Sequence, residues 1–123
     1  MSPLSLRVVD SITQLDERDQ GCIAVSGSHG GVSSARYALA ACPLLSVFND
    51  AGGGKDDAGL AALALLQAQG LAACTVAHAS ARIGDAQSTL DDGIINHVNA
   101  AAARMGIAAG QRCVDAVTAI RNP

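Results

Sequence analysis

The chain has 123 residues, of which eight are Lys or Arg and eleven are Asp or Glu, and its net charge at pH 7 is −3. Half of the residues are hydrophobic and only 15% are charged, which excludes the low hydrophobicity and high net charge of a disordered chain. The length predicts a single domain over 1–123, because domains typically hold about 100–150 residues. The scarcity of aromatic side chains, with one Tyr and one Phe, and the lack of a basic cluster argue against nucleic acid as a partner.

Hydropathy and side-chain size bear on location and assembly. No apolar run approaches the roughly 18 residues of a membrane span, and residues 1–20 lack the basic start and apolar segment of a signal peptide. We therefore expect a cytoplasmic protein with no membrane partner. A core built from small aliphatic side chains buries little apolar area per residue, so we expect a homo-oligomer.

Short apolar runs predict the strands. Residues 4–9, 22–26, 44–48 and 71–77 are nearly continuous apolar stretches, typical of parallel strands that are covered on both faces. The direction of the first strand stays open. Residues 10–20 between the first two strands fit either a short helix or a turn.

Helical spacing appears between the strands. Residues 32–41 follow two glycines, and residues 58–69 end at Gly70, which is a typical helix stop. Both segments have the length of a crossover between parallel strands, so residues 22–77 predict a right-handed βαβαβ unit.

The last third of the chain predicts two more helices. Apolar residues recur at helical spacing from Leu90 to Met105, with Thr89 before the segment and Gly106 after it. A final helix is predicted over 111–120. Together the elements predict an α/β domain, a small three-layer Rossmann-like fold with a mainly parallel sheet of about four strands.

The four cysteines show neither a CxxC pair nor zinc-ligand spacing. Cys22, Cys42 and Cys74 adjoin small apolar residues, which favours buried thiols that act as small hydrophobic groups. A catalytic cysteine at Cys42 or Cys113 is the alternative.

Polar, glycine-rich segments follow three of the predicted strands, at 26–31, 49–57 and 78–85. If those strands are parallel, all three segments open at the same edge of the sheet. Ligands of open α/β sheets bind outside the carboxyl ends of the strands. The sequence therefore predicts a site where these three segments meet.

Lys55, the one lysine of the chain, follows the glycines 52–54, whose backbone N–H groups could approach an anion. The segment is not a P-loop, because Asp56 stands where Ser or Thr is needed, and no dinucleotide fingerprint is present. Asp56 and Asp57 are interpreted as caps of the following helix, whereas Asp50 is a functional candidate.

The segment 26–31 has three interpretations. It could bind an anion through backbone N–H groups, it could place His29 as a general acid or base, or it could be a structural turn that needs only its glycines. It lacks the nucleophile elbow of α/β-hydrolases.

Arg82 lies just beyond His78 and could clamp a carboxylate with its planar fork; an ion pair with Asp85 or Asp50 is the alternative role. Our hypothesis is that Arg82 and Lys55 bind an anionic group while His29 or His78 transfers a proton. Asn96, His97 and Asn99 fall on the predicted helix before Gly106 and are interpreted as packing or oligomer-contact residues.

The predicted function is that of a small metabolic enzyme, a hydrolase of a compact polar or anionic molecule that uses acid–base chemistry; a lyase or isomerase could use the same groups. The alternatives are a non-catalytic regulatory module that binds a metabolite or nucleotide, and a subunit that contributes part of a shared active site. Asp50 and Asp85 with a histidine follow no diagnostic metal spacing, so we expect neither a metal nor a cofactor. The catalytic candidates are His29, Asp50, Lys55 and His78, and the binding candidates are Ser26, Ser28, Gly30, Gly31, Asn49, Gly53, Ser80, Arg82 and Asp85.

Overall fold

A computed structural model describes residues 4–122, apart from the side chain of Asp56. The strands are β1 (Leu6–Val9), β2 (Ile23–His29), β3 (Leu45–Asn49), β4 (Ala72–Val76) and β5 (Ile95–Val98). The helices are α1 (Val32–Ala41), α2 (Ala61–Gln67), α3 (Ala86–Asp92), α4 (Ala100–Arg104) and α5 (Cys113–Arg121). Shorter 3-10 turns are η1 (Ile12–Gln14), η2 (Glu17–Asp19) and η3 (Lys55–Leu60).

The strands form one five-stranded sheet in the order β1-β2-β3-β4-β5. The first four strands run parallel, and β5 pairs with β4 in the antiparallel direction. The fold is therefore α/β and Rossmann-like, as the sequence predicts. The direction of β1, which the sequence leaves open, is parallel.

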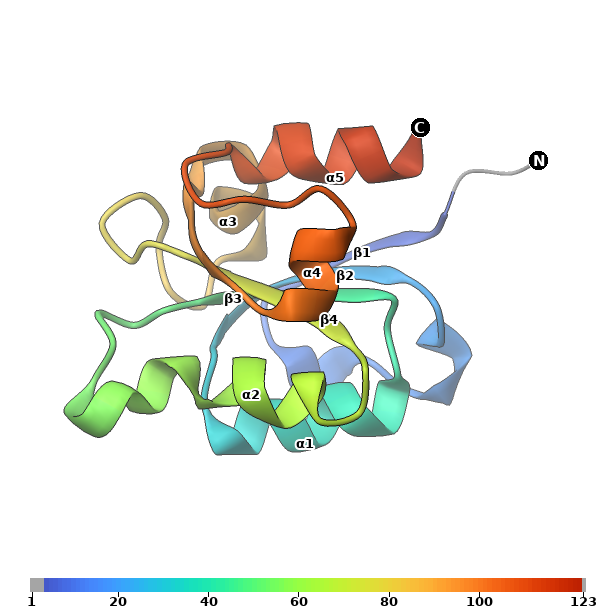
Figure 1. Cartoon of the computed structure of the whole chain (residues 1–123), viewed down its shortest axis with the longest axis horizontal. Coiled ribbons are helices and arrows are strands. Elements are labelled where there is room, and N and C mark those ends of the chain that lie inside the picture. Colours follow the sequence, from blue (N-terminus) through green and yellow to red (C-terminus); the bar gives the residue numbers. More distant parts are fainter. Residues whose placement is uncertain (1–3, 123) are drawn as a thin grey trace.

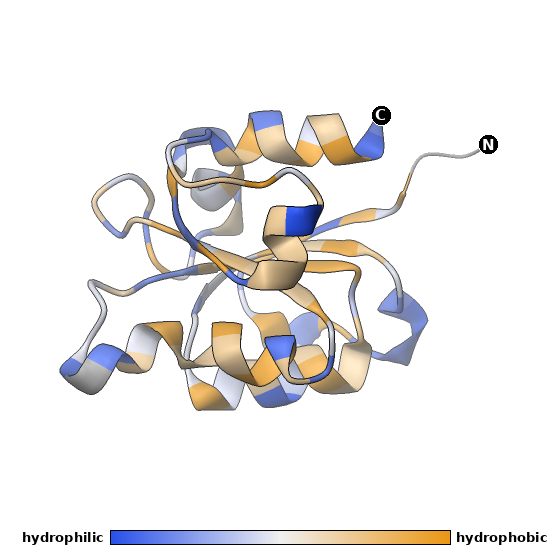
Figure 2. Cartoon of the chain, viewed as in Figure 1, coloured by the Kyte–Doolittle hydropathy of each residue, from blue (hydrophilic) through white to orange (hydrophobic). Residues whose placement is uncertain are grey.

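Helices cover both faces of the sheet. Figure 1 shows α1 and α2 on one face and α3, α4 and α5 on the other. Figure 2 shows the hydrophobic colouring concentrated on the strands and on helix faces turned toward them. Each face has its own cluster of buried side chains, because successive residues of a strand point to opposite sides.

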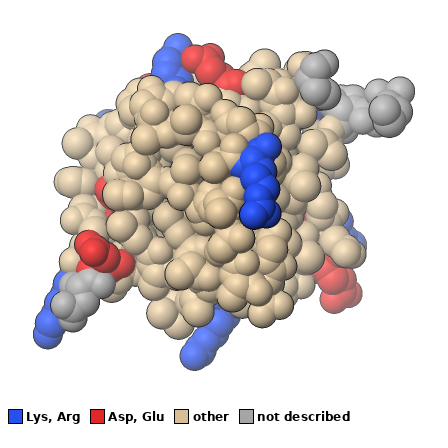
Figure 3. Space-filling view, in the orientation of Figure 1, with Lys and Arg blue, Asp and Glu red and all other residues tan. Residues whose placement is uncertain are grey.

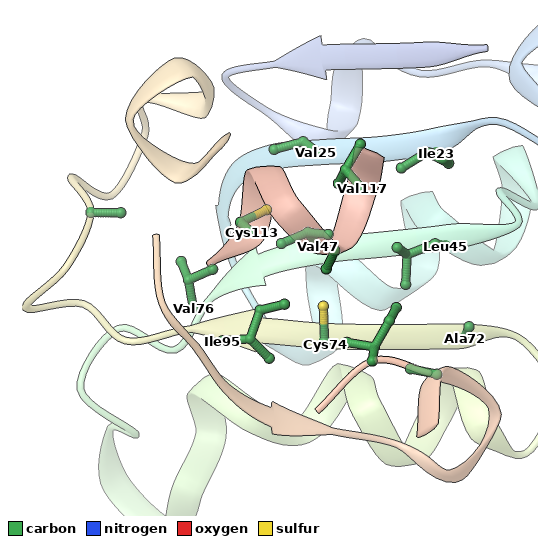
Figure 4. Close-up of a cluster of buried hydrophobic side chains, with 14 residues drawn as sticks. Ile23, Val25, Leu45, Val47, Ala72, Cys74, Val76, Ile95, Cys113 and Val117 are labelled. Atoms are coloured by element: carbon green, nitrogen blue, oxygen red, sulfur yellow. The ribbon is translucent and has the colours of Figure 1, made fainter. Parts of the chain in front are cut away.

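The core under α5 is built from medium-sized side chains of β2, β3, β4 and β5. Figure 4 shows it with the sulfur atoms of Cys74 and Cys113. The opposite core includes the one phenylalanine, Phe48, and many alanines. On that side the alanines allow α1 and α2 to lie close to the sheet and to one another.

The first two predicted helices are present with modest changes. Residues 32–41 form α1 as expected, while the segment predicted over 58–69 begins as η3 and becomes α-helical only from Ala61. The final helix, predicted over 111–120, is α5. Residues 10–20 hold two 3-10 turns.

Asp57 does not cap a helix, contrary to the sequence interpretation. It lies inside η3 with φ 58°, and the residue at the N-cap of η3 is Gly54. The side chain of Asp56 lies outside the described part of the structure.

The single helix predicted from Leu90 to Met105 is wrong. The chain leaves α3 after Asp92, extends as β5, and turns helical again only at α4. The physical reason is the open edge of β4, where the Ala77 N–H donates to the Ile94 carbonyl and the Asn99 N–H donates to the Ala73 carbonyl. This pairing adds a fifth strand to the sheet of about four that the sequence predicts.

No helix within residues 4–122 has the length and hydrophobicity needed to cross a membrane. The face of the molecule shown in Figure 3 is mostly uncharged, and its charged side chains lie mainly near the rim.

Candidate functional site

The loops after β2, β3 and β4 meet at one end of the sheet, as the parallel strands require. The Gly30 N–H donates to the Asn49 carbonyl at 3.0 Å, and the Gly84 N–H donates to the Gly27 carbonyl at 2.7 Å. The His78 N–H donates to Asp50 Oδ1 at 2.9 Å. The expectation that these three segments are neighbours is therefore confirmed, and Figure 1 shows the loops after β3 and β4 at the same end of the sheet.

Glycines permit this close packing of backbones. A Cβ atom on Gly30 would lie 2.4 Å from the Gly59 carbonyl oxygen, and one on Gly59 would lie 2.1 Å from the Asp50 carbonyl oxygen. Similarly, a Cβ on Gly27 would lie 2.4 Å from the Asp85 nitrogen. At these positions glycine is needed because the neighbouring atom belongs to the backbone and cannot rotate away.

Asp50 is the buried acid at the centre of the junction. Only 7% of the residue is exposed, and its Oδ1 accepts the N–H groups of Gly52 at 2.8 Å and His78 at 2.9 Å. Burial by itself would raise the pKa of Asp50, but these hydrogen bonds, a third from the Asn96 amide, and the nearby His78 together hold the pKa below its ordinary value. Asp50 is therefore a carboxylate at neutral pH.

Asn96 supplies the contact to the other oxygen of this carboxylate. Its Nδ2 donates to Asp50 Oδ2 at 2.7 Å, and its Oδ1 accepts the Thr75 hydroxyl at 2.7 Å. The carboxylate can only accept, so the amide must turn its N–H group toward Asp50 and leave its oxygen for Thr75. The sequence analysis missed this role because it placed Asn96 on a helix, and the spacing of Ile94, Ile95 and Val98 does not by itself distinguish a helix from a strand.

His78 brings a titratable group against Asp50. Its Nδ1 lies 3.4 Å from Asp50 Oδ1, and its side chain is 61% exposed. The backbone of His78 is held by the same carboxylate oxygen, so ring and main chain are anchored to one group. Asp50 therefore orients the imidazole on its buried side, while the other side of the ring is open to solvent.

A cleft of about 480 Å³ opens beside His78. It lies between the β4–α3 loop and α3, and its lining combines charged, hydroxyl and apolar side chains. The lining residues are Ala51, His78, Ala79, Ser80, Ala81, Arg82, Ile83, Ser88 and Asp92.

Three of the sequence-predicted site residues line this cleft, namely His78, Ser80 and Arg82. The Ser80 hydroxyl donates to the Ala77 carbonyl at 2.6 Å and accepts the Ile94 N–H at 2.9 Å, so it is occupied in joining β4 to the start of β5. Asp50 stands directly behind His78. The predicted ion pair of Arg82 with Asp85 or Asp50 is absent within 4.0 Å among the side chains that the structure describes.

Four other predicted binding residues are used in holding the loops. The Ser26 hydroxyl donates to the Val47 carbonyl, and the Ser28 hydroxyl accepts the Ile12 N–H. The Asn49 amide bridges two loops by donating to the Ala81 carbonyl and accepting the Ala51 N–H. Asp85 caps α3 by accepting the Ser88 N–H at 3.0 Å. These contacts position the loops and leave little capacity for a ligand.

The remaining predicted residues lie outside the cleft lining. The exposed ring of His29 covers Gly31, whose added Cβ would lie 2.6 Å from the ring. Lys55 is exposed at the start of η3, and Gly53 donates its N–H to the Asp50 carbonyl. Gly30 is enclosed by Gly59. The structure therefore does not bring His29 or Lys55 to the cleft that holds His78.

The cysteines and acids that the structure describes bear on metal binding and on nucleophilic chemistry. Among the described side chains, a set without that of Asp56, no group of three or more His, Cys, Asp or Glu is arranged to hold a metal ion. Burial raises the pKa of the Cys113 thiol to about 12 and the pKa of Cys74 still further, so neither supplies a thiolate at neutral pH. Cys22 is also buried, whereas Cys42 at the end of α1 is partly exposed.

Comparison of the chain with known protein families, with curated proteins and with solved structures finds no significant match.

Proposed function

We propose that the chain is a small acid–base enzyme that hydrolyses a compact molecule with an anionic group, and that the cleft beside His78 is its active site. The observation that carries the proposal is the contact between the exposed His78 imidazole and the buried, ionised carboxylate of Asp50. A carboxylate in this position fixes the orientation of an imidazole that transfers a proton.

Each group has a distinct role in this proposal. His78 removes a proton from the attacking water while the water oxygen bonds to the electrophilic carbon of the substrate. When the bond to the leaving group breaks, His78 returns the proton to that group. Arg82 binds the anionic end of the substrate through its guanidinium fork, and Asp50 acts as a positioning residue because it contacts His78 and not the cleft.

The test is a comparison of two histidine variants. Wild-type protein is first assayed for turnover of a panel of small carboxylate-bearing esters and amides, and the best substrate is then used with His78→Gln and His97→Gln. His97 is exposed on β5 and outside the cleft lining, so it is the matched control. We expect kcat to fall roughly 10²–10⁴-fold for His78→Gln, the usual contribution of a general acid or base, and to change less than about twofold for His97→Gln.

Equal activity of the two variants would contradict the proposal. Ligand binding without turnover by any member of the panel would instead favour the non-catalytic binding module.

The exposure of His78 favours a second candidate, a subunit that contributes part of a shared site. A side chain that is 61% exposed is poorly shielded from bulk water, and catalytic sites usually exclude it. In this version a homo-oligomer forms and a neighbouring copy covers the cleft. Specific activity that rises with protein concentration, in step with the mass measured by light scattering, would support the shared site, and constant activity of a monomer would exclude it.

A further inference from the structure

The cleft and the hollow beside it hold groups of opposite charge. Arg82 and Asp92 both line the cleft. An adjoining hollow of about 330 Å³ shares Arg82, Ser88 and Asp92 with the cleft and adds Asp85 and Asp91. A purely anionic molecule bound to Arg82 would therefore lie beside several carboxylates, which repel it.

Of these three acids, Asp92 lines the cleft as well as the hollow, and its one hydrogen bond is the longest. Asp85 Oδ1 is occupied by the Ser88 N–H, and Asp91 Oδ2 accepts the Gln87 amide at 3.0 Å. For Asp92 the described residues provide one long contact, the Ser88 hydroxyl at 3.5 Å from its Oδ2. Because a carboxylate accepts several hydrogen bonds, Asp92 can bind a cationic group that enters the cleft.

Arg82 is the matching site for a carboxylate. Its backbone N–H donates to the Ser88 hydroxyl at 3.0 Å, which fixes the position of its main chain at the cleft wall. Among residues 4–122 no carboxylate of a described side chain lies within 4.0 Å of its guanidinium nitrogens. The planar fork is thus available to bind a carboxylate through two N–H donors.

An apolar wall completes the cleft. Ile83 is 55% exposed, the largest exposed fraction among the exposed large hydrophobic residues of the described chain. It lines the cleft together with Ala51, Ala79 and Ala81. Exposed apolar side chains in a concave site suit the apolar part of a small ligand.

We infer that the cleft binds a zwitterion of the amino-acid type, with its carboxylate on Arg82, its ammonium group on Asp92 and a short apolar part against Ile83. This inference rests on the proposed function for the location of the site, and it narrows the substrate from an anion to a molecule with both charges. The hydrolysed bond is then a side-chain ester or amide of such a molecule, because an ester of its carboxylate or an amide of its amine would remove one of the two charges.

The inference is tested on the unaltered protein with L-leucine and two analogues that each lack one of its charged groups. L-leucine carries both charges, 4-methylpentanoate lacks the ammonium group, and 3-methylbutylamine lacks the carboxylate. Binding is measured by titration of backbone amide resonances, with 6-aminohexanoate as a zwitterion of wider charge separation. We expect a zwitterion to bind at least about tenfold more tightly than either singly charged probe, with shifts centred on residues 78–92, because each charged contact contributes roughly a factor of ten or more.

Charge-removing variants assign the two ends. Arg82→Gln is expected to lower the affinity for zwitterions at least about tenfold and to leave the affinity for 3-methylbutylamine unchanged. Asp92→Asn is expected to lower the affinity for zwitterions by a similar factor and to leave the affinity for 4-methylpentanoate unchanged. Arg104→Gln and Asp115→Asn, on exposed residues outside the cleft lining, are the matched controls and should bind like wild type.

Two results would overturn the inference. One is that 4-methylpentanoate binds as tightly as the zwitterions and Asp92→Asn changes nothing; the other is that no zwitterion of the set shifts residues 78–92. Neither result bears on the proposed proton transfer by His78. That proposal is contradicted separately if His78→Gln retains turnover.

Discussion

At the scale of single residues, Asp50 organises the site through hydrogen bonds that only an ionised carboxylate can accept together. Its two oxygens receive three N–H donors from three different segments, Gly52, His78 and Asn96. These donors outweigh the burial that would favour the protonated form, and the same contacts hold the loop of His78. The stability of this junction and the orientation of the His78 ring therefore both depend on the charge of Asp50.

The pH dependence of the unfolding free energy tests whether the charge of Asp50 stabilises the fold. Because the pKa of Asp50 is lowered in the folded state, its contribution is fully present above the unfolded pKa of about 3.9 and is lost as pH falls through the folded value. Asp50→Asn should remove that part of the acid dependence, so the unfolding free energy of the variant falls less steeply below about pH 4.

At pH 7, Asp50→Asn should lower the free energy of unfolding by about 1–3 kcal/mol. The NH₂ group of the new asparagine would face the Asn96 N–H group, which would then have no acceptor. Urea unfolding of wild type and variant at several pH values measures both effects. Asp16, whose pKa is lowered to about 2 by hydrogen bonds from Arg18, titrates in both proteins and cancels in the comparison. Parallel pH curves for the two proteins would show that Asp50 carries no depressed pKa.

At the scale of elements, the contact of η3 with the end of β3 depends on Gly59. A Cβ added there would lie 2.1 Å from the Asp50 carbonyl oxygen, so the backbone itself would have to shift. We expect Gly59→Ala to destabilise the fold by about 2–3 kcal/mol, in the range of overpacking substitutions.

Gly31→Ala provides the comparison for this substitution. The added Cβ would meet the ring of His29, which is exposed and free to rotate. The expected loss is about 1 kcal/mol or less, mainly from the weaker N-cap of α1. Chemical denaturation of both variants measures the difference, and equal losses would show that the close approach at Gly59 is not rigid.

The elements also show what the sequence could and could not predict. The short, nearly continuous apolar runs at β2, β3 and β4 are typical of buried strands, and their parallel pairing follows from the helical crossovers between them. The short run from Ile94 to Val98 fits a helix or a strand. Pairing with the open edge of β4 makes it a strand, and that pairing is a tertiary contact. For that reason Asn96 could not be assigned to the site.

Loop placement was predictable only as far as the edge of the sheet. The common direction of the strands brings the segments at 26–31, 49–57 and 78–85 to one end, and it correctly joins Asp50 to His78. How each loop turns beyond that edge depends on close backbone contacts such as Gly30 with Gly59. These contacts direct His29 and Lys55 away from the cleft lining, which neither residue type nor spacing reveals.

At the scale of the whole molecule, the sheet and its two helical layers bring Asp50, His78 and Arg82 to the same end of the sheet. The parallel strands bring the loops together, β5 supplies Asn96 from the antiparallel edge, and α3 forms the far wall of the cleft with Ser88 and Asp92. The central claim is that this one cleft, rather than the surface around His29 and Lys55, is where the chain binds its substrate.

A crystal structure of the protein with the tightest-binding ligand found in the titrations tests this claim most directly. The account predicts density in the cleft, with the ligand carboxylate on the Arg82 guanidinium and the ligand within reach of the His78 ring. Density beside His29 and Lys55, or in the hollow between the α4–α5 loop and α5, with the cleft beside His78 empty, would contradict it.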